Sequence, residues 1–378
     1  MLGRIKYLIV GLGIMGSTRT ALADLPLFQQ YPLLQQSLPR VQLGQWPTPI
    51  EKLHHFGKYL NSNQLFIKRE DYCGKSFSGN KVRKLEFLLA DVIKQNKKSV
   101  ICYGGVASNN VTATAIYAKQ LGLECVAFLM DQLPAANLQR NLILDYYYGC
   151  KFFLCPYNRE LTSQELQNFL HEHNLDEQPY VIPMGSSNKI GIIGWVNAVF
   201  ELKNQIEQGI MPEPDYMYVS FGSMGTVAGI LLGIKAAGLK TKVKPIQVTD
   251  PKKYTPEKLC IMIQQSNDLL HEIDPTFPLF TWNSQDIQII TNFFGSEFAC
   301  HTPEADHAQK LLWDLEHIVV DESYTAKVIA GLLHDCKNGN IQPDDVVLYW
   351  HTYCAHDFTE IVTQVAMHQL PVEFQKYL

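Results

Sequence analysis

The feature of this sequence that most restricts its fold is the alternation of short, continuous apolar segments with segments of helical periodicity. The apolar segments have the length of strands and lie at 64–68, 98–103, 124–130, 180–183, 216–220, 244–249 and 345–350. Between them run helical patterns, such as Leu85, Leu88, Leu89 and Val92 at spacings i, i+3, i+4 and i+7. Continuous apolar strands are typical of parallel sheets that helices cover on both faces. The sequence therefore predicts an α/β fold.

The length and charge of the chain limit both its organisation and its partners. A chain of 378 residues predicts two domains. With 46% hydrophobic and 18% charged residues it can bury large cores, and its net charge of −5 provides no basic field for nucleic acid. No apolar run approaches the roughly 20 residues of a membrane span. We therefore expect no nucleic-acid partner and no membrane span.

The cysteines and histidines do not suggest a metal centre or a disulfide framework. The nine cysteines are an odd, scattered set without CxxC spacing, which favours reduced and mostly buried thiols. The twelve histidines include no HExxH motif. We expect no metal site.

Residues 1–24 carry two competing motifs. The segment GLGIMG at 11–16 follows a strand-like run and matches GxGxxG, which would suggest a nicotinamide oxidoreductase. That reading needs an acidic residue about 20 positions on, but no acid lies between Asp24 and Glu51, and Pro26 and Pro32 interrupt the expected second strand. The same residues also resemble a secretory signal, with basic residues before the apolar run 8–15 and small residues at 21–23. Because the run is short and Arg19 interrupts the approach to the small residues, we expect a cytoplasmic extension and keep export as the alternative.

Three glycine-bearing turns carry the candidate chemistry. In SGNKVRKLE at 78–86, Lys81 lies on the stripe of Leu85 at the first turn of a predicted helix. Burial and the helix dipole disfavour its ammonium form, as a Schiff-base lysine requires, although a lysine whose amine reaches solvent would also fit. At 103–110 a strand runs into a helix start with Ser108, which suits a bound carboxylate or a plain helix cap. The turn SFGSMGT at 220–226 suits a phosphate or a simple tight turn.

Together these turns would supply an amine, a carboxylate-binding site and a phosphate-binding site. This combination points to a specific family. The run SGNKVRKLEF at 78–87 resembles the lysine segment of the D-cysteine desulfhydrases and 1-aminocyclopropane-1-carboxylate (ACC) deaminases. These are pyridoxal-phosphate (PLP) enzymes of the tryptophan-synthase-β type, fold type II. Six further segments match in the family's order: WPTPI at 46–50, IKRED at 67–71, GGVASN at 104–109, IPMGSSN at 182–188, GSMGT at 222–226 and DESYT at 321–325. The resemblance therefore spans about residues 27–360.

The resemblance implies a domain plan. It implies a larger PLP-binding domain formed by 25–84 and 193–378, and a smaller domain, 85–192, that closes on the substrate. Each would contain a mostly parallel sheet flanked by helices. Residues 1–24 would form an extension outside this plan, and the enzyme would be a homodimer.

The resemblance also implies roles for individual residues. Lys81 would hold PLP covalently and move the proton at the substrate Cα. Asn109 would hydrogen-bond the 3′-oxygen of PLP, and Ser108 and Asn110 would hold the substrate carboxylate. Tyr324 would lie beside the substrate as an acid, a base or a positioning group, so that Lys81, Tyr324 and Ser108 form the expected catalytic set.

The remaining implied contacts are with the phosphate and the ring. The phosphate would be wrapped by Gly222, Ser223, Met224, Gly225 and Thr226. Thr325 would contact the pyridine nitrogen, with Thr352 nearby. Because a neutral hydroxyl does not stabilise a protonated ring nitrogen, the expected electron sink is weak, which suits the loss of a good leaving group.

These assignments predict a carbon–sulfur lyase that converts D-cysteine or a related small amino acid into pyruvate, ammonia and hydrogen sulfide. ACC deaminases carry Glu and Leu where this chain has Thr325 and Thr352, and ACC deamination is the nearest alternative. A PLP-binding protein without turnover is a second alternative, because Phe298 stands where the family usually has a tyrosine and Tyr353 replaces a glycine. We expect Phe298 to contact the substrate.

Overall fold

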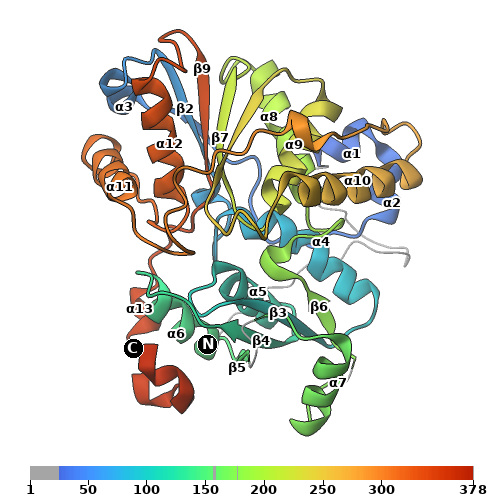
Figure 1. Cartoon of the computed structure of the whole chain (residues 1–378). Helices are drawn as coiled ribbons and strands as arrows, with labels where there is room; N and C mark the ends of the chain where they lie inside the picture. Colours follow the sequence, from blue (N-terminus) through green and yellow to red (C-terminus); the bar gives the residue numbers. More distant parts are fainter. Residues whose placement is uncertain (1–24, 156–158, 177, 378) are drawn as a thin grey trace.

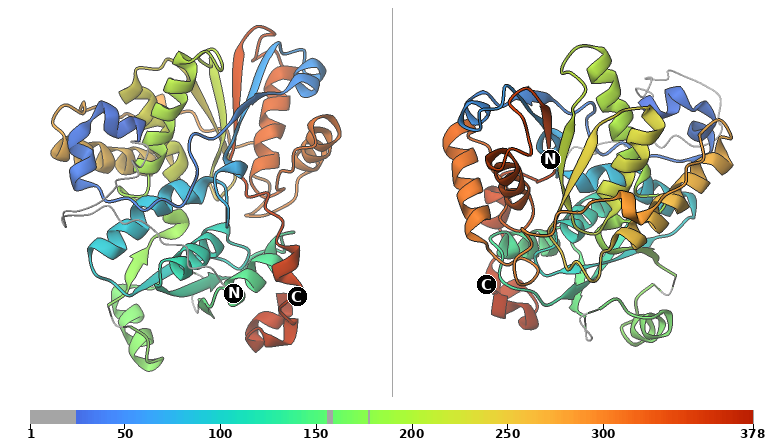
Figure 2. Two further views of the ribbon diagram at one scale, coloured as in Figure 1. Left: turned by 180° about the vertical axis from the view of Figure 1, so that it is seen from behind. Right: turned by 45° about the horizontal axis from the view of Figure 1, so that its top comes forward.

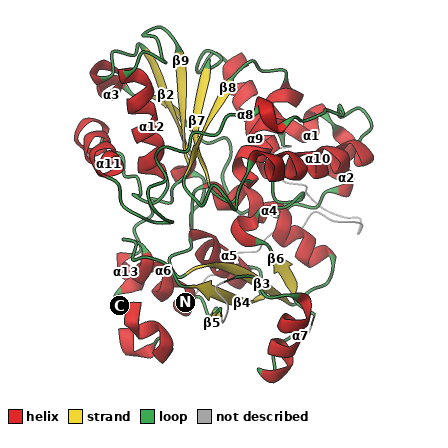
Figure 3. Cartoon of the chain, in the orientation of Figure 1, coloured by secondary structure: helices red, strands yellow, loops and turns green. Residues whose placement is uncertain are grey.

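The computed structural model describes residues 25–155, 159–176 and 178–377, which form two sheets flanked by helices (Figures 1 and 3). The expected α/β fold is confirmed. The GxGxxG motif and the signal-like segment, both within 1–24, lie outside the described residues. Among the described residues, no helix combines the length and the apolar character needed to cross a membrane.

The larger sheet has the strand order β1-β2-β9-β7-β8. Strand β1 is antiparallel to β2, and the other neighbouring strands pair in parallel. Gln64 of β2 lies opposite Val346 of β9, so the sheet joins distant parts of the sequence. The strand bounds are Ile50–Lys52 (β1), Gln64–Arg69 (β2), Tyr216–Phe221 (β7), Lys242–Gln247 (β8) and Val346–His351 (β9).

Alternate side chains of this sheet enter two separate cores. On β9, Leu348 and Trp350 pack into one core, whereas Val347 and Tyr349 pack into the other. One face is covered by α1 (Pro26–Gln30), α2 (Pro32–Ser37), α8 (Ile193–Glu207), α9 (Gly225–Ala237) and α10 (Pro256–Ile273). The other face is covered by α3 (His54–Tyr59), α11 (Pro303–Glu316) and α12 (Thr325–Lys337) (Figure 2).

The smaller sheet is entirely parallel, in the order β5-β4-β3-β6. Its strands are Ser99–Gly105 (β3), Glu124–Met130 (β4), Lys151–Leu154 (β5) and Tyr180–Ile182 (β6). One face packs on α4 (Asn80–Lys94), α5 (Asn109–Gln120) and α6 (Leu138–Tyr147), and the other on α7 (Ser163–Glu172).

The chain ends against this smaller sheet. Phe374 is fully buried, and its ring lies 4.9 Å from that of Phe152 on β5. The C-terminal turns therefore run from the larger sheet back to α6 (Figure 1). The remaining short elements are η1 (Glu70–Tyr72), η2 (Met184–Ser186), η3 (Ser284–Asp286), α13 (Thr359–Val362), η4 (Met367–Gln369) and η5 (Val372–Tyr377).

The sequence predicted the strands well, with two omissions. Each of the seven predicted strands is present with its ends displaced by at most two residues. The omitted strands, β1 and β5, both lie at sheet edges, as do the predicted strands β6 and β8. The two omitted strands have three and four residues, too few to show a period.

Candidate active site

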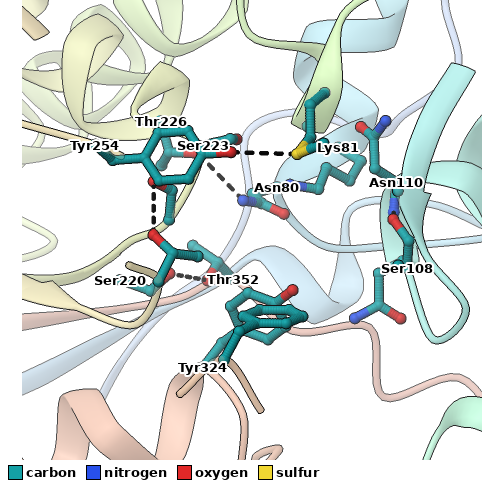
Figure 4. A pocket seen from close by; sticks show the side chains of 18 of the residues that line it. Asn80, Lys81, Ser108, Asn110, Ser220, Ser223, Thr226, Tyr254, Tyr324 and Thr352 are labelled. Carbon is teal, nitrogen blue, oxygen red and sulfur yellow. Dashed lines mark hydrogen bonds between the residues drawn. The ribbon is translucent and has the colours of Figure 1, made fainter. Parts of the chain in front are cut away.

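A cavity of about 250 Å³ lies where loops after strands of both sheets meet (Figure 4). The larger sheet contributes the loops that follow β7 and β9, and the smaller sheet contributes the ends of β3 and β4. The carboxyl ends of parallel strands are where α/β proteins usually bind their ligands. The two sheets thus share one candidate site.

The cavity brings together nearly all residues that the sequence analysis assigned to a site. Those that line it are Lys81, Ser108, Asn109, Asn110, Gly222, Ser223, Met224, Thr226, Phe298, Tyr324, Thr325 and Thr352. Gly225 does not line it. A Cβ at Gly225 would lie 2.4 Å from Ser187 Oγ and 2.8 Å from Lys84 Nζ, so this glycine lies against the residues behind the wall.

Lys81 occupies the first turn of α4 and faces the cavity (Figure 4). The turn before it requires Gly79, which has φ +85° and whose Cβ would lie 2.6 Å from the carbonyl oxygen of Thr352. Burial lowers the pKa of Lys81 from 10.5 to about 8. A substantial fraction of this amine is therefore neutral and nucleophilic near neutral pH.

A second buried amine lies three residues further along the same helix. Lys84 Nζ donates to the carbonyl oxygen of Gly185 at 3.0 Å and to Ser187 Oγ at 3.1 Å. Burial lowers its pKa, and Lys81 lowers it further. None of the described carboxylates pairs with it, so an anion bound here would supply the missing charge.

The loop between β7 and α9 surrounds this region with polar groups. Ser223 Oγ lies 2.9 Å from Ser187 Oγ. Asn80 Nδ2 donates to Thr226 Oγ1 at 3.1 Å (Figure 4). Met224 has φ +70°, and the amide of Gly225 bonds back to Ser223 O at 2.9 Å, which makes a tight γ-turn. A strained turn at the start of a helix directs free amides outward, as anion binding requires.

Ser108 and Asn110 form the opposite side of the cavity at the start of α5. Ser108 Oγ accepts from the amides of Asn110 and Val111 at 3.3 and 3.4 Å, which leaves its hydroxyl proton available as a donor. Asn110 Oδ1 accepts from Ser186 Oγ at 2.7 Å, but Asn110 Nδ2 is buried without a partner. An unsatisfied buried donor beside a helix N-terminus fits a carboxylate.

The side chain of Asn109 is held by α6, which the sequence analysis did not include in the site. Its Oδ1 accepts from Asn137 Nδ2 and Asn141 Nδ2, each at 3.0 Å, and from Arg140 Nη2 at 3.4 Å. Because donors occupy the oxygen, Asn109 presents its NH₂ group as the donor that remains. Arg140 also donates to Asn141 Oδ1 and to Tyr353 Oη, which fixes the orientation of both amides.

The far wall combines hydroxyl and aromatic groups. Thr352 Oγ1 lies 3.3 Å from Ser220 Oγ. The ring of Phe298 packs edge-on against Tyr324 at 5.8 Å. Burial raises the pKa of Tyr324, so its phenol stays protonated.

Thr325 is hydrogen-bonded to a carboxylate that the sequence analysis did not assign to the site. Its Oγ1 donates to Asp321 Oδ1 at 2.5 Å. Asp321 lies within the matched segment DESYT, but sequence alone could not show which way its side chain points. Lys253 and Tyr254 also line the cavity, and no motif pointed to them.

Comparisons with known proteins agree with this geometry. A family model described as pyridoxal-phosphate dependent enzyme matches residues 41–352. The chain is similar to an ACC deaminase homologue, with 27% identity and a TM-score of 0.71 over 88% of this chain and 98% of the other. It shares its fold with a PLP-dependent aspartate racemase (17% identity, TM-score 0.58, 83% and 92% covered). It also shares its fold with threonine deaminase isoform 2 from Solanum lycopersicum (18% identity, TM-score 0.53, 90% and 87% covered).

The cavity fits PLP. The cofactor needs an amine for its aldehyde and a polar, positively charged cradle for its phosphate. Lys81 supplies the amine, and Ser223, Thr226 and the start of α9 supply a polar wall, with Ser187 and Lys84 directly behind it. A Cβ at Gly185 would lie 1.9 Å from Ser223 Oγ, so only glycine leaves this cradle open.

Proposed function

The chain belongs to the family of pyridoxal-phosphate dependent enzymes, and from that membership we propose that it is a carbon–sulfur lyase. Its proposed substrate is D-cysteine or a related small amino acid. Loss of sulfide from the β-carbon, followed by hydrolysis, converts cysteine and water into pyruvate, ammonia and hydrogen sulfide.

The observation that carries this proposal is the pair of threonines in the cavity wall, Thr325 and Thr352. The ACC deaminases that the sequence resembles carry a carboxylate and an aliphatic side chain at these positions. Thr352 Oγ1 instead joins Ser220 Oγ at 3.3 Å, which makes this part of the wall polar. A polar wall suits a polar substituent such as a thiol better than an apolar cyclopropane ring.

The other residues have chemistry that suits elimination. The cofactor supplies an electron sink for the negative charge that develops at Cα. The neutral amine of Lys81 takes the Cα proton, while Asn110 Nδ2 and the Ser108 hydroxyl bind the substrate carboxylate. The protonated phenol of Tyr324 donates a proton to the leaving sulfur.

The test is a side-by-side assay of the purified holoenzyme with D-cysteine, L-cysteine and ACC. We expect sulfide and pyruvate from D-cysteine at a much higher kcat/KM than 2-oxobutyrate from ACC. Tyr324→Phe should lower kcat for D-cysteine by about 10²- to 10⁴-fold, the usual contribution of a general acid, with little effect on PLP content.

A matched variant tests the role of the threonine pair. Thr352→Leu should lower activity towards D-cysteine more than activity towards ACC. A wild-type enzyme that prefers ACC by a wide margin would instead support a ring-opening deaminase, the alternative that the 27% identity to an ACC deaminase homologue favours. An enzyme that binds PLP but turns over none of the three substrates would contradict both proposals.

A further inference from the structure

We propose that Cys125 and Cys150 form a redox-active pair, in which a peroxide oxidises the two thiols to a disulfide. Cys125 is the second residue of β4, and Cys150 directly precedes β5. Both thiols are free in the structure. Neither residue lines the active-site cavity, so the proposal stands apart from the cofactor and from the proposed substrate.

The register of the smaller sheet places the two side chains next to each other. In the parallel pair of β4 and β5, Val126 lies opposite Lys151, and the two cysteines stand one residue before them. Both cysteines belong to the core on the face that α5 and α6 cover. The Cys150 thiol donates to Cys125 Sγ at 3.4 Å. Neighbouring strands are about 4.8 Å apart, which is within the roughly 4.4–6.8 Å between the Cα atoms of a disulfide, so this pair can be bridged.

A third thiol, Cys102, lies in the same core but is placed wrongly for a bridge to Cys125. In the pair of β3 and β4, Cys125 lies opposite Val100, and Cys102 stands two residues further along β3. Two residues advance a strand by about 6.6 Å, so the Cα atoms of Cys102 and Cys125 are about 8 Å apart. Cysteines whose Cα atoms are more than about 7 Å apart are not bridged without backbone movement. The geometry therefore selects Cys150 as the partner.

A second cavity gives a small oxidant access to the pair. It has a volume of about 180 Å³, lies between α5 and the turn that joins α6 to β5, and has Cys125 in its wall. A far smaller cavity holds a water molecule, so hydrogen peroxide fits in this one. Cys102 and Cys150 do not line it. Cys125 is therefore the thiol that an oxidant in this cavity contacts.

The neighbouring thiols favour the thiolate of Cys125, which is the form that reacts with peroxides. Hydrogen bonds with Cys102 and Cys150 lower the pKa of Cys125, although burial opposes the change. The hydrogen bond with Cys125, together with burial, instead raises the pKa of Cys150. Cys125 is thus the attacking thiol and Cys150 the resolving thiol.

The charged groups around the cavity are compatible with these roles. Lys119 and Lys151 line the cavity, and Lys151 Nζ lies 3.6 Å from the carboxylate of Glu124. The buried carboxyl that interacts with Cys125 is Asp145 on α6, and burial raises its pKa. A carboxyl that holds its proton opposes a nearby thiolate less than an ionised one would.

The oxidation consumes one molecule of hydrogen peroxide. The Cys125 thiolate attacks one peroxide oxygen, so that an S–O bond forms, the O–O bond breaks, and the leaving hydroxide takes up the proton that Cys125 released. The Cys150 sulfur then attacks the Cys125 sulfur. The S–S bond forms, the S–O bond breaks, and the hydroxyl leaves as water with the proton of Cys150. Two thiols and one peroxide thus give one disulfide and two waters, with the sulfurs oxidised and the peroxide oxygens reduced.

The bridge would span the segment that carries α6. Cys125 and Cys150 are 25 residues apart in the sequence, and α6 lies between them. Asn141 of this helix donates to Asn109 in the active-site cavity. The disulfide would therefore fasten to the sheet the end of a helix that also supports the active site.

The test maps the disulfide in the folded holoenzyme. Reduced enzyme, freed of reductant, is treated with hydrogen peroxide, and the remaining thiols are alkylated under denaturing conditions. Tryptic peptides are then analysed by mass spectrometry without reduction. Cleavage after lysine and arginine places the three clustered thiols on separate peptides, 99–119, 120–140 and 141–151. We expect one linked species, 120–140 joined to 141–151, that forms with peroxide and is lost on treatment with a thiol reductant.

Two variants separate the roles of the thiols. Cys150→Ala should abolish the linked species and leave Cys125 as a sulfenic acid, which dimedone labels. Cys102→Ala is the matched control, because it removes the same atoms from the same core, and it should keep the link between 120–140 and 141–151. The map of the wild type needs no variant, so it remains informative if a variant fails to fold.

Three outcomes would overturn the proposal. Cys125 and Cys150 that are both alkylated after peroxide treatment would show that the pair does not react. A link from 99–119 to either of the other peptides would show that Cys102 is the partner. Oxidation of Cys125 to a sulfinic acid without any link would show that Cys150 does not resolve it.

Discussion

The rate at which the apoenzyme captures PLP should rise with pH only up to about 8. The reacting group is the neutral amine of Lys81, whose pKa burial lowers from 10.5 to about 8. At pH 7 about one such amine in ten is neutral, whereas an unperturbed lysine would have about three neutral amines in ten thousand. On the fraction of neutral amine alone, we expect capture at pH 7 to be about 300-fold faster than with an unperturbed lysine.

The assay follows the visible absorbance of PLP after mixing with apoenzyme at pH values from about 6 to about 10, so that both titration limits are covered. The lysine derivative Nα-acetyl-lysine, mixed with PLP under the same conditions, reports the unperturbed amine. Pyridoxal without its phosphate separates the ionisation of Lys81 from that of the phosphate. An enzyme rate that still climbs tenfold per pH unit above about pH 9, as the lysine derivative should, would refute a lowered pKa at Lys81.

Three further outcomes are expected. Borohydride reduction of the holoenzyme followed by peptide mapping should place the pyridoxyl group on Lys81, and a label on any other lysine would contradict the assignment. Glu201 pairs with the buried cations Lys68 and Arg83 at 2.7 and 2.9 Å. Glu201→Gln should therefore cost about 3–5 kcal/mol in urea unfolding, whereas Glu207→Gln on the surface should cost less than about 1 kcal/mol. Asn141→Leu should weaken PLP binding about fivefold in equilibrium titrations, since Asn109 loses a donor that holds its amide and a hydrogen bond is worth about 1 kcal/mol. Unchanged affinity in that variant would show that Asn109 needs no support from Asn141.

The fold could be predicted from the sequence because its central strands are buried on both faces. A strand such as Glu124–Met130 is apolar almost throughout, and its predicted bounds are those of the structure. The pattern could not give the order of the strands. The pairing of Gln64 with Val346 depends on how the chain returns to the first part of the sheet, and no local periodicity records that.

The candidate site was predictable only where its residues belong to motifs. Lys81, the expected carboxylate-binding residues Ser108 and Asn110, and the loop 222–226 each lie in a turn with glycine or small polar residues. Sequence reasoning can recognise such turns. Arg140 and Asn141 lie in an ordinary helical segment, and their contact with Asn109 exists only because α6 packs beside α5. Asp321 was within a matched segment, but its hydrogen bond to Thr325 depends on the geometry of a helix start.

Three basic residues, Lys81, Arg83 and Lys84, share the buried start of α4. A helix N-terminus disfavours positive charge, and burial disfavours it further. Arg83 turns away from the cavity and donates to Glu70 and Glu201 at 2.8 to 3.1 Å, so it remains charged.

Lys81 and Lys84 point the other way and have no such partners. Burial lowers the pKa of Lys81 to about 8, so about one amine in ten is neutral and nucleophilic at pH 7. Lys84 donates only to the neutral oxygens of Gly185 and Ser187, so a bound phosphate would be its first anionic partner. The carboxylates of Glu70 and Glu201 therefore do two things at once. They hold the start of α4 in place through Arg83, and because they bond to Arg83 rather than to the two lysines, they leave one amine reactive and the other ready to bind an anion.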